Sequence, residues 1–204
     1  DALEGTLVFT AGSEIASGKI MVNGTSATVE ATIQVVDVSD ATLDVSGYVL
    51  EQTDAARTFK IPNGTTVGAG GYVIVARESD KGAFEGHFGV TLGENVIFIN
   101  SSKSGDFFPS INGGETFTLK DKGGSKLDGP TVAIGATTNF QRKIPMGAAS
   151  DAASWNGGGD ATPGSGQPVP VETNGLYISE FSDAPGTGNF VYEFVELHFD
   201  GPKL

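Results

Sequence analysis

The sequence contains no cysteine, only two histidines and a single tryptophan among its 204 residues. The lack of cysteine excludes disulfides, thiolate nucleophiles, zinc fingers and iron–sulfur clusters. The two histidines, His87 and His198, leave little material for a histidine-rich metal site or a proton relay. No apolar run approaches the roughly 20 residues that a membrane-spanning helix requires. We therefore expect no membrane insertion, and a fold stabilised by its core and hydrogen bonds alone.

Positive charge is also scarce. The chain has 12 Lys and Arg residues against 25 Asp and Glu residues, which gives a formal net charge of −13. Nucleic-acid phosphates would be repelled by such a chain, so we expect no binding to nucleic acid. The same charge keeps an exported protein soluble and apart from its neighbours, and we expect an extracellular or cell-surface location.

Alternation between apolar and polar side chains is the main structural signal. Residues 27–35 show it most clearly, with an apolar residue at every odd position. Because successive side chains of a strand point to opposite faces, this segment is predicted to be a half-buried strand. The runs at 72–76 and 96–99 are apolar throughout, as central strands would be. Asn-Gly and Gly-Gly turns separate such segments, and this pattern predicts an all-β sandwich or barrel.

Only one helix is expected, at about 79–88, with Ser79 or Asp80 as its N-cap. Its two internal glycines limit it to a turn or two. We expect the core to contain Val29, Ile33, Val35, Tyr72, Ile74, Phe98, Phe117, Leu119 and Trp155.

Four phrases in a fixed order carry a family resemblance. Residues 37–48 end in Leu-Asp-Val-Ser-Gly-Tyr, and residues 58–76 contain Phe-Lys-Ile-Pro-Asn-Gly-Thr followed by Gly-Gly-Tyr. Residues 112–121 read Asn-Gly-Gly-Glu-Thr-Phe-Thr-Leu-Lys-Asp, and Gln141-Arg142, Trp155 and Thr162-Pro163-Gly164 follow. Together these phrases resemble bacterial lamin-tail domains. The resemblance implies an immunoglobulin-like β-sandwich.

The opening phrases of that family occur at the other end of this chain. They usually read Ile-Ser-Glu and then Glu-Phe-Ile-Glu-Leu, and the good matches here lie within residues 176–204. We therefore expect a lamin-tail-like sandwich at 1–155, a Gly/Pro-rich linker at 156–175 and, at 176–204, a strand pair resembling the start of a second repeat. The implied fold is an immunoglobulin-like β-sandwich with additional C-terminal strands.

The C-terminal strand pair needs a sheet to join, because an isolated hairpin buries too little apolar surface to be stable. It pairs either with this sandwich or with that of a neighbouring molecule. We favour strand exchange between molecules, and therefore self-association. The residues expected at this strand-addition interface are Leu176, Ile178, Phe181, Phe190, Phe194, Leu197 and Phe199.

Two acidic groups are candidates for metal binding. Asp37, Asp40 and Asp44 lie close together in the sequence, as do Asp121 and Asp128. Calcium favours such oxygen-rich loops, but neither group has the spacing of an EF-hand. We expect turn aspartates that bond their own backbone, and we name calcium as the one cofactor left open.

A second cluster near the C-terminus consists of Glu180, Glu193, Glu196 and His198. On a regular strand Glu196 and His198 share one face and Glu193 lies on the other. Two ligands on one face do not make a catalytic zinc site, so we expect polar positions on an edge strand.

Catalysis has no support in the sequence. No serine occurs in a Gly-x-Ser-x-Gly motif, and no glycine-rich loop is followed by the Lys-Ser/Thr pair of a phosphate-binding loop. We therefore expect a non-catalytic structural or adhesion module of an exported protein. Two alternatives stay open: an accessory domain of a secreted hydrolase or nuclease, and a subunit of a surface filament or layer.

Overall fold

The computed structural model of the chain describes residues 21–22, 25–26, 41–53, 56–133, 138–144, 146–167, 174–184 and 190–202. The strand predicted at 27–35, with the core candidates Val29, Ile33 and Val35, lies outside the described residues.

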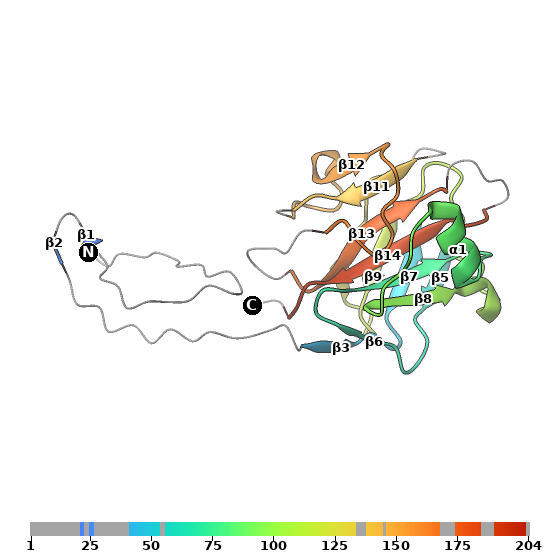
Figure 1. The fold of residues 1–204 in the computed structure, drawn as a ribbon, viewed down its shortest axis with the longest axis horizontal. Helices are drawn as coiled ribbons and strands as arrows, with labels where there is room; N and C mark the ends of the chain where they lie inside the picture. Colours follow the sequence, from blue (N-terminus) through green and yellow to red (C-terminus); the bar gives the residue numbers. More distant parts are fainter. Residues whose placement is uncertain are drawn as a thin grey trace.

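Two β-sheets stack face to face and form the body of the protein (Figure 1). The larger, six-stranded sheet has the order β12–β11–β13–β14–β7–β8, and the four-stranded sheet has the order β10–β9–β4–β5. This arrangement confirms the predicted all-β sandwich. The larger sheet consists of β12 (Trp155–Gly157), β11 (Asn139–Arg142), β13 (Leu176–Ser182), β14 (Phe194–Phe199), β7 (Gly71–Ala76) and β8 (Val96–Asn100).

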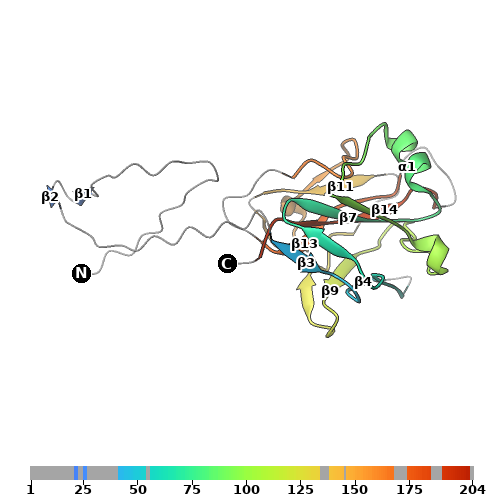
Figure 2. The ribbon, with the colours of Figure 1, turned by 60° about the horizontal axis from the view of Figure 1, so that its bottom comes forward.

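The smaller sheet and two short ladders complete the strands. The four-stranded sheet consists of β10 (Lys126–Asp128), β9 (Phe117–Lys120), β4 (Val49–Gln52) and β5 (Arg57–Lys60). One ladder pairs β3 (Thr42–Asp44) with β6 (Thr66–Gly68), and the other pairs β1 (Met21–Val22) with β2 (Thr25–Ser26). Short 3₁₀ turns occupy Ser101–Ser104 and Ala152–Ser154. Figure 2 shows β4 and β9 on the opposite side of the body from α1 and β11.

The main core lies between the two sheets. Alternate residues of the central strands point into it, as the period of two requires. Trp155 closes one end: its indole Nε1 donates to the Ala149 carbonyl at 2.8 Å, and the Arg142 guanidinium lies 4.7 Å from its ring centroid. The predicted core positions Phe117, Leu119 and Trp155 are buried in this cluster. The larger sheet contributes Val73, Val75, Ile178, Phe181, Val195 and Leu197, and the smaller one Leu50 and Phe59.

A second apolar cluster lies on the outer face of the larger sheet, beneath helix α1 (Lys81–Phe88). Its centre is Phe84, whose ring centroid lies 5.1 Å from that of Phe98. Tyr72, Ile74 and Phe98, which were predicted as core, pack here and not between the sheets. This face needs a cover because β7 is apolar on both sides.

Helix α1 begins where the sequence predicts it. The Asp80 side chain caps it by accepting from the Ala83 amide at 2.9 Å, and Gly89 ends it with a φ of 66°. The helix lies between β7 and β8 in the chain, and these two strands are parallel. Parallel strands need such a crossover, because a tight hairpin turn reverses the chain direction.

The C-terminal strands occupy the middle of the larger sheet. β14 pairs with β7 along its whole length, from Phe194 opposite Ala76 to Phe199 opposite Gly71, and β13 lies between β14 and β11. The structure pairs these strands within one chain, which is one of the two pairings that the sequence left open. Leu176, Ile178, Phe181, Leu197 and Phe199 are buried in the main core, Phe194 in the outer cluster, and Phe190 lies partly buried with the Arg77 guanidinium 4.6 Å from its ring.

Two domain boundaries predicted from composition also change. The sandwich does not end at residue 155, because its central strands come later. The part of the predicted linker that the structure describes, 156–167 with 174–175, includes β12, which pairs with β11, and a loop that covers the outer face of the sheet.

Among the described segments, none of the helices has the length and apolar character needed to cross a bilayer.

Candidate functional site

The candidate calcium ligands that the structure describes, Asp44, Asp121 and Asp128, each bind other groups of the protein. Asp37 and Asp40 lie outside the described residues, and Asp44 is a turn aspartate whose Oδ1 accepts from the Ser46 amide at 2.9 Å. Hydrogen bonds from the Ser46 side chain and backbone lower the pKa of Asp44. Asp121 accepts from the amides of its own turn, and Asp128 pairs with Arg142 at 3.2 Å. Within the described parts of the chain, no three His, Asp or Glu side chains are placed to share a metal ion.

A buried carboxylate pair lies on the outer face of the larger sheet. Glu180 of β13 and Glu196 of β14 are directly opposite each other in the ladder, and both are 0% exposed. The loop at 160–167 donates to both. Glu180 accepts from the Thr162 amide at 2.8 Å, and Glu196 accepts from the Gly164 amide at 2.5 Å and from the Ser179 hydroxyl at 2.7 Å. The Thr-Pro-Gly phrase of the sequence is therefore the segment that covers the two glutamates.

This environment favours the protonated form of the pair. Burial raises the pKa of Glu180 to about 7, although the hydrogen bonds from Thr162 oppose the shift. Burial, and then repulsion by Glu180, raise the pKa of Glu196 well above its usual value. Two adjacent carboxylates cannot both ionise cheaply away from water. At neutral pH we infer that the pair holds at least one proton.

Aromatic and imidazole side chains continue the buried polar cluster. His198 lies on the same face as Glu196, as predicted, with its ring centroid 4.3 Å from that of Tyr72 and 5.6 Å from that of Tyr177. The Tyr177 hydroxyl donates to Gln167 Oε1 at 3.3 Å. Burial lowers the pKa of His198 and raises those of Tyr72, to about 12, and of Tyr177. The imidazole and both phenols are therefore neutral at physiological pH.

The third glutamate of the cluster is separate. Glu193 immediately precedes β14, and its Oε2 accepts from the Ile111 amide at 2.8 Å. Burial raises the pKa of Glu193 to about 9. The prediction that these acidic residues are polar positions on an edge strand is wrong, because β14 is a central strand and all of them are buried. Each instead binds backbone amides of a covering loop.

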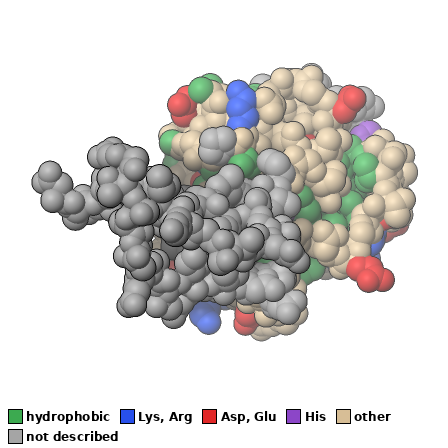
Figure 3. All heavy atoms as spheres, turned by 60° about the vertical axis from the view of Figure 1, so that its left-hand side comes forward, with side chains coloured by type: hydrophobic (Ala, Val, Ile, Leu, Met, Phe, Trp, Pro, Cys, Tyr) green, Lys and Arg blue, Asp and Glu red, His purple; other side chains and the backbone are tan. Residues whose placement is uncertain are grey.

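This geometry limits the chemistry that the cluster can do. A general acid or base must come within hydrogen-bond reach of its substrate. The side chains of Glu180, Glu193 and Glu196 accept hydrogen bonds from the protein's own loops. Glu180 and Glu196 are also fully shielded from solvent. On the described part of the face in Figure 3, charged side chains are scattered singly and form no concentrated patch.

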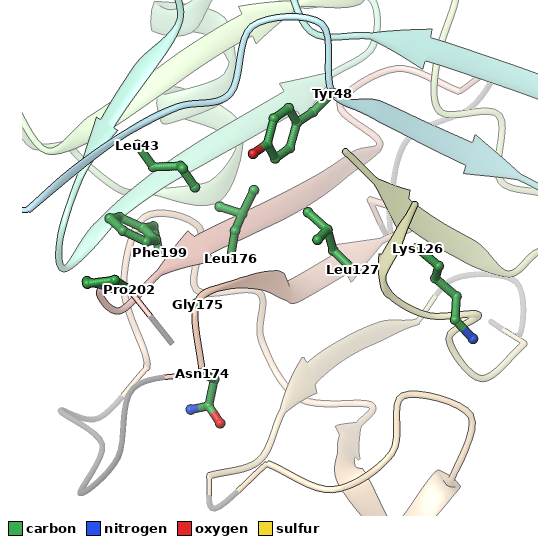
Figure 4. A pocket seen from close by; sticks show the side chains of 9 residues that line it. All are labelled: Leu43, Tyr48, Lys126, Leu127, Asn174, Gly175, Leu176, Phe199 and Pro202. Atoms are coloured by element: carbon green, nitrogen blue, oxygen red, sulfur yellow. The ribbon is translucent and has the colours of Figure 1, made fainter. Parts of the chain in front are cut away.

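An apolar groove lies at one end of the sandwich and has a volume of about 410 Å³. In Figure 4, Leu43, Leu127 and Leu176 converge beside the ring of Tyr48, while Lys126 extends away from them. Leu127 is 45% exposed and is one of two large hydrophobic side chains exposed in the described regions. The complete lining is Leu43, Tyr48, Lys126, Leu127, Asn174, Gly175, Leu176, Phe199 and Pro202.

No family model, curated protein or solved structure matches this chain.

The groove was missed in the sequence, and so was the role of Thr162 and Gly164. The groove combines residues from β3, β10, β13 and β14, which only the fold brings together. The sequence held one signal that Leu127 would be exposed: it is a lone leucine between two charged residues, Lys126 and Asp128, shortly after a Gly-Gly turn.

Proposed function

We propose that this protein is a non-catalytic structural module of an exported or cell-surface protein, and that it works by associating with other copies of itself. One observation carries the proposal. The side chains best suited to acid–base chemistry are closed beneath the protein's own loops, whereas the exposed apolar groove is open to a partner.

The family resemblance supports a structural role. In lamin-tail domains the Ile-Ser-Glu and Glu-Phe-Ile-Glu-Leu strands open the domain, and here their counterparts are β13 and β14. We interpret the chain as a lamin-tail-like, immunoglobulin-like sandwich whose opening strands are supplied by residues 176–199. From the sequence alone we expected one lamin-tail-like copy followed by the opening strands of a second copy. We now propose a single copy, because β13 and β14 fill the middle of the same sheet.

The position of the groove supports association. The Ala69 amide donates to the Ala41 carbonyl and the Gly70 amide to the Phe199 carbonyl, so the two ends of the described sandwich lie side by side. The groove lies at that same end, between Leu43 and Pro202. Copies that met at this groove would be joined at this end of the sandwich.

The test is the molar mass of the full chain in solution, measured by light scattering over a range of concentrations. We expect the wild type to associate and Leu127→Asp to be monomeric. Phe107→Asp is the matched control, because Phe107 is 42% exposed and lies beside Arg77, beyond the opposite end of β7. A wild-type chain that stays monomeric at every concentration would reject the proposal.

A further inference from the structure

We propose that strand β8 pairs with β8 of a second copy, edge to edge and antiparallel, so that the larger sheets of the two copies join into one. This inference rests on the proposed function. The β8 pairing is a contact additional to the groove, and it forms between copies that the groove contact holds together.

The lack of protection distinguishes β8 from the other edge strands of the two stacked sheets. β12 and β10 have three residues each, and the pairing of β10 with β9 is irregular. β5 carries Arg57 and Lys60 at its two ends. β8 has five residues, no charged side chain and a regular register with β7. Natural proteins protect exposed edges by shortness, bulges or charge, so an edge that has none of these is suited to a partner strand.

The backbone of β8 is available on the side away from β7. The Asn95 carbonyl accepts from an amide of β7 at 2.9 Å, so the backbone groups of this residue point towards β7. Those of Val96, Phe98 and Asn100 therefore point to the open edge, because the backbone groups of successive residues alternate in direction. The Val96 amide donates to the Gly93 carbonyl at 3.1 Å. The Val96 carbonyl and the amides of Phe98 and Asn100 remain for an added strand.

Pairing centred on Phe98 matches the faces of the two sheets. Phe98 packs on the outer face beneath α1, whereas Ile97 and Ile99 pack against the main core. Residues directly opposite each other in a ladder lie on the same face. With Phe98 opposite Phe98 of the second copy, Ile97 lies opposite Ile99, and the outer faces of both sheets coincide. The two Phe98 residues then exchange hydrogen bonds, and the Asn100 amide donates to the Val96 carbonyl of the second copy.

The same register places opposite charges together at both ends. Glu94 precedes β8 and Lys103 follows it, and both are exposed. In the register centred on Phe98, Glu94 lies opposite Ser102 of the second copy and beside its Lys103. Residues 95–102 are uncharged, so the paired strands themselves add no repulsion between two chains of net charge −13. Because the twofold symmetry repeats the contact of Glu94 with Lys103, the edge is complementary to itself.

The β8 pairing is too small to hold two copies by itself. A stable interface buries about 800 Å² on each partner. This contact uses a single strand of five residues from each copy. Copies held in one assembly by the groove present their β8 edges to each other at a high effective concentration, which makes a weak second contact effective. Leu127→Asp should therefore remove the β8 pairing together with the groove contact.

Carbodiimide cross-linking of the full chain tests the pairing, because this reagent joins a carboxylate to an amine only where the two groups touch. Within one chain the five residues of β8 keep Glu94 and Lys103 about 16 Å apart, at roughly 3.3 Å per residue. A bond between them therefore forms only between copies. A mixture of isotopically labelled and unlabelled chains is cross-linked, digested and analysed by mass spectrometry. We expect at least fivefold more mixed-isotope product joining Glu94 to Lys103 than joining Glu94 to Lys122, which is also exposed.

Two controls accompany this measurement. The Lys120 Nζ and Glu51 Oε1 atoms lie 2.6 Å apart within one chain, so their product should carry a single isotope. Leu127→Asp should lower the yield of the product between Glu94 and Lys103 at least fivefold and leave the Lys120 product unchanged.

Two outcomes would overturn the inference. Equal mixed-isotope yields at Lys103 and Lys122 would show that the copies meet at random and not along β8. A product between Glu94 and Lys103 that Leu127→Asp leaves undiminished would show that the pairing does not depend on the groove. If the product is absent while light scattering still shows association that Leu127→Asp abolishes, the proposed function stands and only the β8 pairing is wrong; if the wild type is monomeric, both are wrong.

Discussion

Replacing Glu180 with glutamine should remove part of the pH dependence of stability. Burial raises the pKa of Glu180 from 4.5 to about 7, so the folded protein holds a proton that the unfolded chain releases. The free energy of unfolding therefore falls as the pH rises from about 4.5 to about 7. At roughly 1.36 kcal/mol per pKa unit, the full shift from 4.5 to about 7 is worth about 3 kcal/mol.

The variant Glu180→Gln keeps the local hydrogen bonds while it removes the charge. An amide oxygen can accept from the Thr162 amide, and an amide NH₂ can donate to the Thr162 hydroxyl. We expect wild type and variant to have similar stability near pH 5, and the variant to be more stable by about 2–3 kcal/mol near pH 8. Urea unfolding followed by circular dichroism at a series of pH values measures this difference. Glu94→Gln, a like substitution at an exposed position, is the matched control.

The difference between variant and wild type is the decisive quantity, because other buried groups titrate in the same range. The raised pKa of Glu193 adds to the fall in stability above about pH 4.5, and the raised pKa of Glu196 acts in the same direction. The lowered pKa of His198 acts in the opposite direction below about pH 6.5. The contributions of Glu193 and His198 are the same in both proteins. Glu180→Gln also removes the repulsion that helps to raise the pKa of Glu196, and this widens the difference at high pH. A difference that stays constant from pH 5 to pH 8 would refute the reasoning.

Three further predictions concern the core, the chemistry and the chain order. Trp155→Ala and Phe117→Ala should each lower the free energy of unfolding by about 3–5 kcal/mol, measured by urea unfolding, because both side chains are buried between the sheets; an unchanged unfolding midpoint would contradict this. The purified chain should hydrolyse neither DNA nor a chromogenic ester, and turnover that disappears in Glu196→Gln or Glu193→Gln would overturn the non-catalytic proposal. Deletion of 176–204 should abolish cooperative thermal unfolding, since it removes the two strands between β11 and β7; a truncated chain that melts like the wild type would show that these strands are dispensable.

Local features of the fold were predictable because local chemistry determines them. An aspartate can cap a helix by accepting from the amide three residues later, and Asp80 accepts from the Ala83 amide in the structure. The Gly-Gly turn after Lys122 joins β9 to β10, with Gly124 at a φ of 87°. The apolar runs of β7 and β8 predicted central strands. This is right for β7, which is covered on both faces, and wrong for β8, which is an edge strand of the larger sheet.

Non-local features were not predictable in the same way. Composition makes residues 156–175 look like a linker, yet the amides of Thr162 and Gly164 bind carboxylates on two strands that come later in the chain. Those carboxylates look like ordinary polar positions until β14 is known to be central. Repulsion and burial then require a cover that donates hydrogen bonds. Period-two patterns reveal which residues share a face, but not which strands are neighbours.

The order of the strands connects the buried cluster to the groove. Because β14 lies between β7 and β13, the larger sheet cannot close until residues 194–199 have taken their place, and the cover over Glu180 and Glu196 depends on that closure. The same placement brings Phe199 and Pro202 beside Leu43, and so creates the groove next to the point where the chain enters the sandwich. The groove therefore depends on the closure of the larger sheet, and a chain that has not closed this sheet has no groove.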